Sequence, residues 1–217
     1  MTNFQQARIA MVDCQVRPSD VTRYTVIDAM LSVPREQFVP PQFRNVAYAG
    51  EHIPLGGSRV ILDPRVTGKM LDALALTQDD LVLDVACGTG YIAALAGQMA
   101  EAVIALEADE DIAAQASEVL TGIEADNVVV HTGSLTDGAD MHGPYDAVLI
   151  EGGVEVVPET ILSQLKENGR IAAIFMDGNV GQCRLGRMSQ GQVTWRRAFD
   201  ATAPVLEGFA REKAFEF

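Results

Sequence analysis

Hydrophobic residues follow two different patterns along the chain, and the change comes near residue 80. Before it, apolar positions recur at helical spacing between proline breaks, which predicts helices over residues 21–31 and 64–76. Ser19 and Asp20 precede the first of these segments and are residue types that cap helices. After it, short apolar runs alternate with amphipathic segments, a pattern typical of buried parallel strands joined by helices.

The second part of the chain predicts an open sheet with helices on both faces. The predicted strands cover residues 81–85, 102–106, 128–131, 147–150 and 170–175, and the predicted helices cover 91–99, 110–120 and 159–165. Two further segments, 193–199 and 211–217, are predicted to be strands that pair as a final hairpin. We therefore expect an α/β fold with a doubly wound, mostly parallel seven-stranded sheet and an N-terminal helical extension.

The length of the chain suits a single domain. At 217 residues it is long enough to bury a sizeable core. We expect one domain over residues 1–217, in which 1–76 form the helical extension and 77–217 form a ligand-binding α/β core. The polar, glycine-bearing stretch 50–59 precedes the sheet and is a candidate lid or substrate loop.

The composition narrows the classes of partner. Hydrophobic residues make up 48% and charged residues 21%, an ordinary balance for a globular protein. The formal net charge is -14, with 16 basic residues against 30 acidic ones and no basic run, which argues against a large nucleic-acid surface. No apolar run approaches the roughly 20 residues that cross a bilayer. We expect no nucleic-acid partner and no membrane association.

The cysteines and histidines form no recognisable metal or disulfide pattern. Cys14, Cys87 and Cys183 are widely separated and include no CxxC pair, so neither a disulfide framework nor a thiolate zinc site is predicted. The three histidines also lack metal-ligand spacing. The start of the chain lacks a basic region followed by an apolar one, so we expect a cytoplasmic protein without a metal.

A glycine-rich turn follows the first predicted strand and opens the next helix. Gly88 and Gly90 allow the backbone to turn sharply and a ligand to lie against it. The turn is placed at the carboxyl ends of the strands, where open α/β sheets bind ligands. Glu107 follows the second strand, and its carboxylate can accept two hydrogen bonds from a ribose diol. The spacing also matches the GxGxxG/A pattern of dinucleotide sites, and a packing turn without a ligand is a third interpretation.

Asp84 favours an adenosyl amino acid over a dinucleotide. Its carboxylate precedes the glycines, where it can face the ammonium group of a methionine moiety but would oppose a pyrophosphate. About 80 residues of helical sequence also precede this unit, whereas dinucleotide domains often open with their first strand. After the third strand, Ser134 and Leu135 are placed to meet an adenine ring. The predicted binding residues for S-adenosylmethionine are Asp84, Ala86, Cys87, Gly88, Gly90, Tyr91, Glu107, Gly133, Ser134 and Leu135.

With these residues identified, the chain resembles the protein-L-isoaspartate O-methyltransferase family over most of its length. Residues 33–40 are similar to that family's VPRExFVP segment, and residues 47–48 with 53–56 to its AYxDxxLPIG segment. Residues 83–93 resemble its cofactor loop, and residues 161–170 resemble its LxxQLKPGGR run. Many methyltransferases share the cofactor loop, whereas the upstream segments are more specific to this family.

The resemblance implies a Rossmann-like methyltransferase fold, with S-adenosylmethionine as the methyl donor and S-adenosylhomocysteine as the product. It also implies that the methyl group goes to the side-chain or main-chain carboxylate of a damaged, isoaspartyl residue in a protein or peptide. The ester then promotes succinimide formation and eventual repair. Because a carboxylic acid is already ionised at neutral pH, no general base is required and no catalytic residue is predicted.

The chain departs from the family pattern after the LPIG loop. Family members carry TISxP there, with a Ser hydroxyl near the reacting groups, whereas Val60 and Leu62 stand in place of the two hydroxyl residues here. The acidic residues of the family's AYxD and GDG segments are matched by Gly50 and Ser134. An arginine in this region could grip a carboxylate through two hydrogen bonds. The candidate substrate-binding residues are Arg59, Leu62, Asp63 and Arg65.

Three other functions stay open at this point. The chain could keep the same donor but methylate a small molecule or another protein group. It could bind S-adenosylmethionine without turnover and act through a partner. The dinucleotide pattern leaves an NAD-dependent dehydrogenase as the third.

Overall fold

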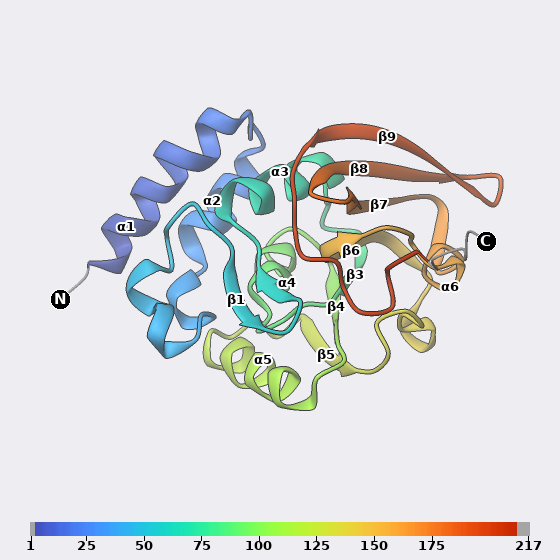
Figure 1. Ribbon diagram of the computed structural model, residues 1–217. Coiled ribbons are helices and arrows are strands. Elements are labelled where there is room, and N and C mark those ends of the chain that lie inside the picture. Colours follow the sequence, from blue (N-terminus) through green and yellow to red (C-terminus); the bar gives the residue numbers. More distant parts are fainter. Residues whose placement is uncertain (1–2, 212–217) are drawn as a thin grey trace, which may run out of the picture.

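The computed structural model describes residues 3–211 and contains a seven-stranded sheet between two covering layers (Figure 1). The strands of this sheet are β3 Leu81–Val85, β4 Ala102–Glu107, β5 Val128–Thr132, β6 Tyr145–Val154, β7 Leu165–Asp177, β8 Val180–Ser189 and β9 Gln192–Asp200. Their order is β5-β4-β3-β6-β7-β8-β9. Neighbouring strands are parallel from β5 to β7, and β8 and β9 extend the sheet antiparallel at one edge. The predicted doubly wound, mostly parallel sheet is therefore confirmed.

The helices cover this sheet and form the N-terminal extension. They are α1 Phe4–Met11, α2 Tyr24–Ser32, α3 Pro64–Leu74, α4 Tyr91–Gly97, α5 Glu110–Gly122 and α6 Glu159–Leu162. A π-helical turn at Val12–Val16 and 3₁₀ segments at Arg17–Ser19, Arg35–Gln37, Pro41–Val46 and Asp140–His142 complete the helical parts. A small antiparallel hairpin, β1 Ile53–Gly56 with β2 Arg59–Ile61, precedes α3. The predicted loop at 50–59 thus contains strands.

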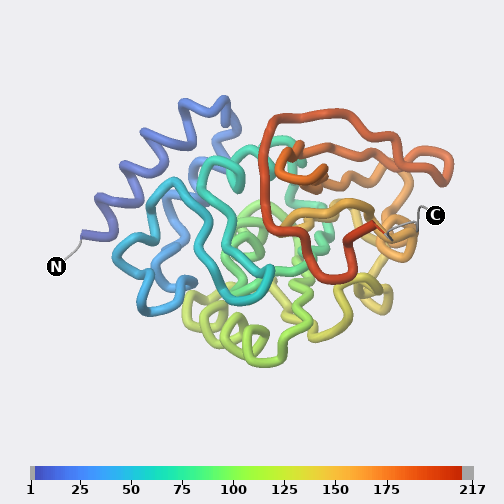
Figure 2. Tube along the Cα trace, in the orientation of Figure 1, coloured from blue at the N-terminus to red at the C-terminus, as the bar shows by residue number. Residues whose placement is uncertain are grey.

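Two apolar clusters hold the sheet between its covering layers. Because successive side chains of a strand point to opposite faces, Val82 of β3 packs with α3, α4 and the N-terminal extension, while Leu83 and Val85 pack on the other face. That other face is covered by α6, by residues 135–139 and by the segment after β9. The segment after β9 runs back across the sheet to the end of β6, where the Gly153 N–H donates to the Pro204 carbonyl at 2.8 Å (Figure 2).

A buried arginine links the N-terminal extension to the sheet. The Arg35 side chain is fully buried and donates hydrogen bonds to the carbonyls of Ala47 at 2.7 Å and Leu62 at 2.8 Å. Its guanidinium carbon lies 4.8 Å from the ring centre of Tyr91, at the start of α4. One side chain therefore holds together the extension, the segment before α3 and the helix that follows the glycine turn.

The second strand of the predicted C-terminal hairpin lies largely outside the described residues. Within them, β9 pairs with β8. Arg211 lies outside any strand, and residues 212–217 are outside the described residues. The hydrophobic pattern does not reveal β8, because glycines and arginines interrupt its apolar positions.

The cap predicted at Ser19 and Asp20 for the helix over residues 21–31, which is α2 in the structure, is wrong. Helix α2 begins at Tyr24, after an N-cap residue, Arg23, whose side chain makes no capping hydrogen bond. Asp20 has a left-handed backbone conformation with φ 64° at the end of the 3₁₀ segment that contains Ser19. These two residues therefore end one turn and do not begin the next helix.

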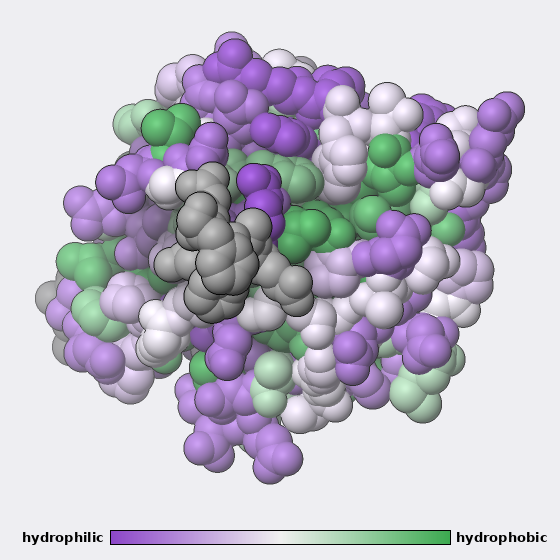
Figure 3. Space-filling model, turned by 45° about the vertical axis from the view of Figure 1, so that its right-hand side comes forward, coloured by the Kyte–Doolittle hydropathy of each residue, from purple (hydrophilic) through white to green (hydrophobic). Residues whose placement is uncertain are grey.

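The surface contains few large hydrophobic side chains. Figure 3 shows hydrophilic residues over much of one face, with hydrophobic residues gathered in a limited area. The large exposed hydrophobic residues of the described part are Ile9, Tyr24, Val46, Val129, Met141, Val156 and Val180. Among residues 3–211, no helix is long and apolar enough to cross a membrane.

Candidate active site

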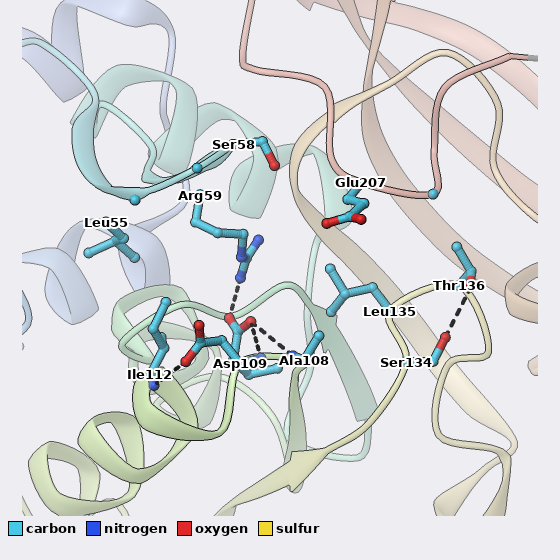
Figure 4. Close-up of a pocket in the computed structure, with 14 residues that line it drawn as sticks. Leu55, Ser58, Arg59, Ala108, Asp109, Ile112, Ser134, Leu135, Thr136 and Glu207 are labelled. Carbon is cyan, nitrogen blue, oxygen red and sulfur yellow. Dashed lines mark hydrogen bonds and ion pairs between the residues drawn. The ribbon is translucent and has the colours of Figure 1, made fainter.

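A cavity of about 580 Å³ lies at the carboxyl ends of β4 and β5 (Figure 4). Residues that follow these two strands form one side of it, and the β1–β2 hairpin and the segment after β9 form the other. The lining residues are Leu55, Gly56, Gly57, Ser58, Arg59, Glu107, Ala108, Asp109, Ile112, Ser134, Leu135, Thr136, Glu207 and Gly208. Its size is within the range of cavities that bind small molecules, and it mixes apolar walls with a few polar groups, as such sites do.

The glycine turn between β3 and α4 supports the floor of the site. Backbone N–H groups of Ala86 and Cys87 both donate to the Leu106 carbonyl, at 2.9 and 3.0 Å, which ties the turn to β4. Gly88 has φ 56° and Gly90 has φ 89°, conformations that favour glycine. The turn therefore needs its two glycines for the backbone path that brings it beside β4.

Glu107 is the most densely hydrogen-bonded group of the site. Its Oε2 accepts from the Gly88 N–H at 2.9 Å and forms an ion pair with Arg59, while Oε1 accepts from the N–H groups of Ala108 at 2.9 Å and Asp109 at 3.2 Å. Glu107 is 1% exposed. A carboxylate offers about four acceptor positions, and all are in use. A ribose diol can therefore bind Glu107 only if the Arg59 guanidinium moves away from it.

Three carboxyl groups lie near the carboxyl ends of three neighbouring strands, on one face of the sheet. Asp84 on β3 is paired with Ala105 on β4 and with Leu149 on β6. Glu107 and Glu151 each lie two residues further along these adjacent strands. Because alternate residues of a strand share a face, all three carboxyl groups are on the face covered by α3 and α4. On the strands to either side of Asp84, the two glutamates therefore lie about 7 Å further toward the carboxyl ends than Asp84 does.

The carboxyl groups of Asp84 and Glu151 are buried, and three of their four oxygens have no hydrogen-bond partner among the described residues. Asp84 is 1% exposed and Glu151 is 2% exposed. Among the described residues, neither oxygen of Asp84 nor Oε1 of Glu151 has a donor, and two nitrogens of Arg59, Nε and Nη1, lack acceptors. A buried carboxylate without a partner is costly, so such a group binds a proton or a ligand.

A shared proton explains how the two carboxyl groups remain buried. Burial raises the pKa of Asp84 to about 7, against the lowering effects of a hydrogen bond with Glu151 and of the Arg59 charge. Burial also raises the pKa of Glu151 well above its usual range, and the charge of Asp84 adds to this. Near neutral pH, the two carboxyl groups therefore keep a proton between them. Within residues 3–211, no group of three or more His, Cys, Asp or Glu is placed to hold a metal ion.

The cavity brings together some of the predicted cofactor residues. Glu107, Ser134 and Leu135 line it, as does Arg59, which was predicted for the substrate. Ser134 Oγ lies 3.1 Å from the hydroxyl of Thr136, another lining residue. The binding role of these residues stays a prediction, but they surround a common space.

The other predicted cofactor residues are not among those that line the cavity. They are Asp84, Ala86, Cys87, Gly88, Gly90, Tyr91 and Gly133. The Tyr91 ring packs edge-on against Phe38 with centroids 5.5 Å apart, within the core of the N-terminal part. Burial raises the pKa of the Cys87 thiol well above its usual value, so this side chain is a packing residue.

The predicted substrate residues are not gathered in one place. Leu62 is 0% exposed and belongs to the hydrophobic core. Asp63 caps α3, where its carboxylate accepts from the Val66 N–H at 2.9 Å. Arg65 is exposed in the first turn of α3. Of the four predicted residues, Arg59 is the one that lines the cavity.

Several acidic residues of the site were not predicted, among them Asp109, which lines the cavity. Glu151 directly follows the apolar run that predicts the fourth strand, and the rule that selected Glu107 after the second strand would also have selected it. Glu207 lines the cavity from the segment after β9, on the side of the hairpin that holds Arg59 (Figure 4). No periodic pattern in that segment signals its return to the site.

Comparison with known proteins identifies close relatives of the chain. A family model described as protein-L-isoaspartate(D-aspartate) O-methyltransferase matches residues 8–195. A protein-L-isoaspartate O-methyltransferase from Roseiflexus castenholzii is 35% identical over 210 residues, which cover 96% of this chain and 95% of the relative. Another, from Gloeobacter violaceus, is 34% identical over 161 residues, which cover 74% of this chain and 78% of the relative.

Two solved structures share the fold. A protein-L-isoaspartate O-methyltransferase superposes with a TM-score of 0.79 at 21% identity, over 94% of this chain and 66% of that longer chain. A beta-aspartate methyltransferase from Plasmodium falciparum, in complex with S-adenosyl-L-homocysteine, also superposes with a TM-score of 0.79, at 18% identity, over 95% of this chain and 99% of that one. At these identities the likeness is one of fold.

Proposed function

The chain belongs to the protein-L-isoaspartate(D-aspartate) O-methyltransferase family, and we propose that it methylates the carboxylate of isoaspartyl residues in damaged proteins, with S-adenosylmethionine as the donor. The observation that carries this proposal is the position of Glu107. Its carboxylate lines the cavity at the end of β4, between the glycine turn after β3 and Ser134 after β5. A carboxylate in that position accepts the hydroxyls of a ribose, which supports an adenosyl ligand.

The reaction places modest chemical demands on the protein. S-adenosylmethionine supplies a methyl group carried by a positively charged sulfur. The acceptor carboxylic acid has an ordinary pKa near 4 and is ionised at neutral pH, so no side chain has to remove a proton from it. The carbon–sulfur bond breaks as the carbon–oxygen bond forms, and the protein contributes by aligning the reacting groups and excluding water.

Two segments are placed to exclude water from the reacting groups. The β1–β2 hairpin contributes Leu55 and Arg59 to the cavity, and the segment after β9 contributes Glu207. Leu206 anchors the second segment over the end of β6, where a Cβ on Gly152 would come within 2.6 Å of the Leu206 side chain. The absence of a side chain at Gly152 therefore lets this cover lie close to the sheet.

Recognition of the acceptor depends on charge more than on hydroxyl groups in this chain. Leu62 stands where family members have a serine and is buried in the core, so it offers no hydrogen bond to a substrate. Arg59 has two nitrogens without acceptors among residues 3–211 and lies at the cavity. We assign to it the grip on a carboxylate, because a guanidinium binds carboxylates through two parallel hydrogen bonds.

A protein-repair role in the cytoplasm is part of the proposal. A methyl ester on an isoaspartyl residue promotes succinimide formation, which is the route back to a normal peptide bond. The three cysteines are free, with Cys87 and Cys183 buried and Cys14 exposed, and this supports a reducing compartment.

Transfer of a labelled methyl group to a peptide tests the proposed function. An isoaspartyl peptide should gain label from S-adenosylmethionine, while the same peptide with a normal aspartate serves as the matched control and should not. The proposal fails if incorporation into the isoaspartyl peptide does not exceed the control at saturating donor. Tight donor binding without turnover on either peptide would instead indicate a binding module.

A further inference from the structure

The order of the strands predicts how an adenosyl amino acid would lie across the site. Ser134 and Leu135 follow β5, Glu107 ends β4, and the glycine turn follows β3, which are consecutive neighbours in the sheet. An adenine near the end of β5 and a ribose at Glu107 direct the rest of the molecule across β3 toward β6. The first side chain that it meets on β6, on the same face, is Glu151.

We propose that Glu151, together with Asp84, binds the cationic methionine end of S-adenosylmethionine, and that the proton which the two carboxyl groups share in the free protein is released on binding. This inference rests on the proposed function and names a binding residue outside the sequence prediction. It is supported by geometry: two buried carboxyl groups on neighbouring strands, on one face, with three oxygens that have no donor among the described residues.

The charges of the site match the charges of the ligand. The methionine end carries a positive sulfonium, a positive ammonium and a negative carboxylate. Asp84 and Glu151 supply two acidic groups for the two cations. The ammonium and the sulfonium replace the shared proton as the positive charge between the carboxyl groups, so burial of both as anions becomes favourable.

The charged groups around Glu151 determine the pH range in which it keeps its proton. Its charged neighbours are Asp84 on β3, Glu107 on β4 and Arg59 on the β1–β2 hairpin. Arg35 and the thiol of Cys87 also lie within its electrostatic reach. Burial and the acidic neighbours favour the protonated form, and Arg59 opposes it. Since Glu151 keeps its proton near neutral pH and the pKa of Asp84 is raised to about 7 in the free protein, binding near neutral pH should release about one proton or more.

Isothermal titration calorimetry in two buffers of different ionisation enthalpy measures this proton directly. The wild-type protein should release a proton on binding S-adenosylmethionine at pH 7, and its affinity should weaken as the pH falls below 7. Glu151→Gln mimics the protonated glutamate and can still donate to Asp84, so the free protein should remain folded. The variant should release fewer protons than the wild type and should bind S-adenosylmethionine roughly tenfold or more weakly. S-adenosylhomocysteine lacks the sulfonium, so its affinity should fall less.

Glu159→Gln is the matched control, because Glu159 is exposed at the start of α6, shortly after Glu151 in the chain. It should bind and release protons like the wild type. Unchanged affinity and proton release in Glu151→Gln would overturn the inference while leaving the methyltransferase proposal standing. If that variant does not fold, calorimetry on the wild type still tests the inference. A wild-type protein that binds S-adenosylmethionine without releasing a proton between pH 6 and 8 would also overturn it. Failure of both adenosyl compounds to bind the wild type would instead refute the proposed function.

Discussion

Replacing Glu107 with glutamine removes one acceptor oxygen from the centre of the cavity while the side chain keeps its size. The amide oxygen can keep the hydrogen bonds from the Ala108 and Asp109 N–H groups, which places the amide NH₂ against the Gly88 N–H and Arg59. Each buried donor that loses its acceptor costs about 1–3 kcal/mol. We therefore expect the free energy of unfolding to fall by about 2–6 kcal/mol.

The same substitution should weaken binding of the cofactor. A hydrogen bond to a charged group contributes about 1.5–3 kcal/mol, so each ribose hydroxyl that loses the carboxylate raises the Kd roughly 10- to 150-fold. Calorimetry with S-adenosylhomocysteine measures the affinity, and urea unfolding measures the stability. Glu110→Gln is the control, because Glu110 is exposed in the first turn of α5 beside the site. A folded Glu107→Gln protein that binds within twofold of the wild type would refute the assignment of this carboxylate to the ribose.

A second substitution separates the two effects. In the Glu107→Gln background, Arg59 is a largely buried cation that has lost its ion pair. Adding Arg59→Gln removes that cation, so the double variant should recover part of the lost stability. It should not recover the affinity, because the carboxylate is still absent. Recovery of both would mean that Glu107 acts only by holding Arg59.

Three further predictions follow from buried or paired side chains. Leu62→Ser should destabilise the fold by about 2–5 kcal/mol, because Leu62 is fully buried, and a thermal melt would show it; an unchanged melting temperature would contradict the packing argument. Asp63→Ala should cost about 0.5–2 kcal/mol through loss of the α3 cap, with little change in methyl transfer; a large loss of activity at unchanged stability would assign Asp63 to the substrate instead. Although burial alone would raise the pKa of Asp146, hydrogen bonds from the Leu81 N–H and Lys166 hold it below its usual value. The stability that Asp146 adds is therefore present above its unfolded pKa near 4 and is lost as the pH falls through the folded value, so acid unfolding of Asp146→Asn should depend less steeply on pH.

The central strands could be predicted because their signal is local. Apolar runs such as 81–85 and 102–106 are buried on both faces of a parallel sheet, and this leaves a continuous hydrophobic segment in the sequence. Strand β8 alternates between buried and more exposed positions, and glycine and arginine interrupt its apolar residues, so its pattern is weak. Its pairing with β9 depends on a turn and a register that composition does not specify.

For the candidate site, too, some residues could be predicted from local sequence signals, whereas others depend on how distant segments pack. Glu107 could be predicted because it directly follows a strand whose end is known to face the ligand. Arg59 was identified as a cation near the site, but its ion pair with Glu107 depends on how the β1–β2 hairpin folds over the sheet. Leu62 and Asp63 were candidates by position in the chain, and the structure places one in the core and the other at a helix start. Sequence position alone does not say which way a side chain points.

The arrangement of charges has a consequence for turnover. Asp84, Glu107 and Glu151 with Arg59 have a formal charge of two negatives when every acid is ionised, and one when the shared proton is bound. S-adenosylmethionine carries one more positive charge than S-adenosylhomocysteine. A negatively charged site therefore binds the donor more tightly than the product, which favours replacement of the product by a new donor molecule. Once the sulfonium charge is gone, the acid pair returns to its protonated form, and this weakens the hold on the product.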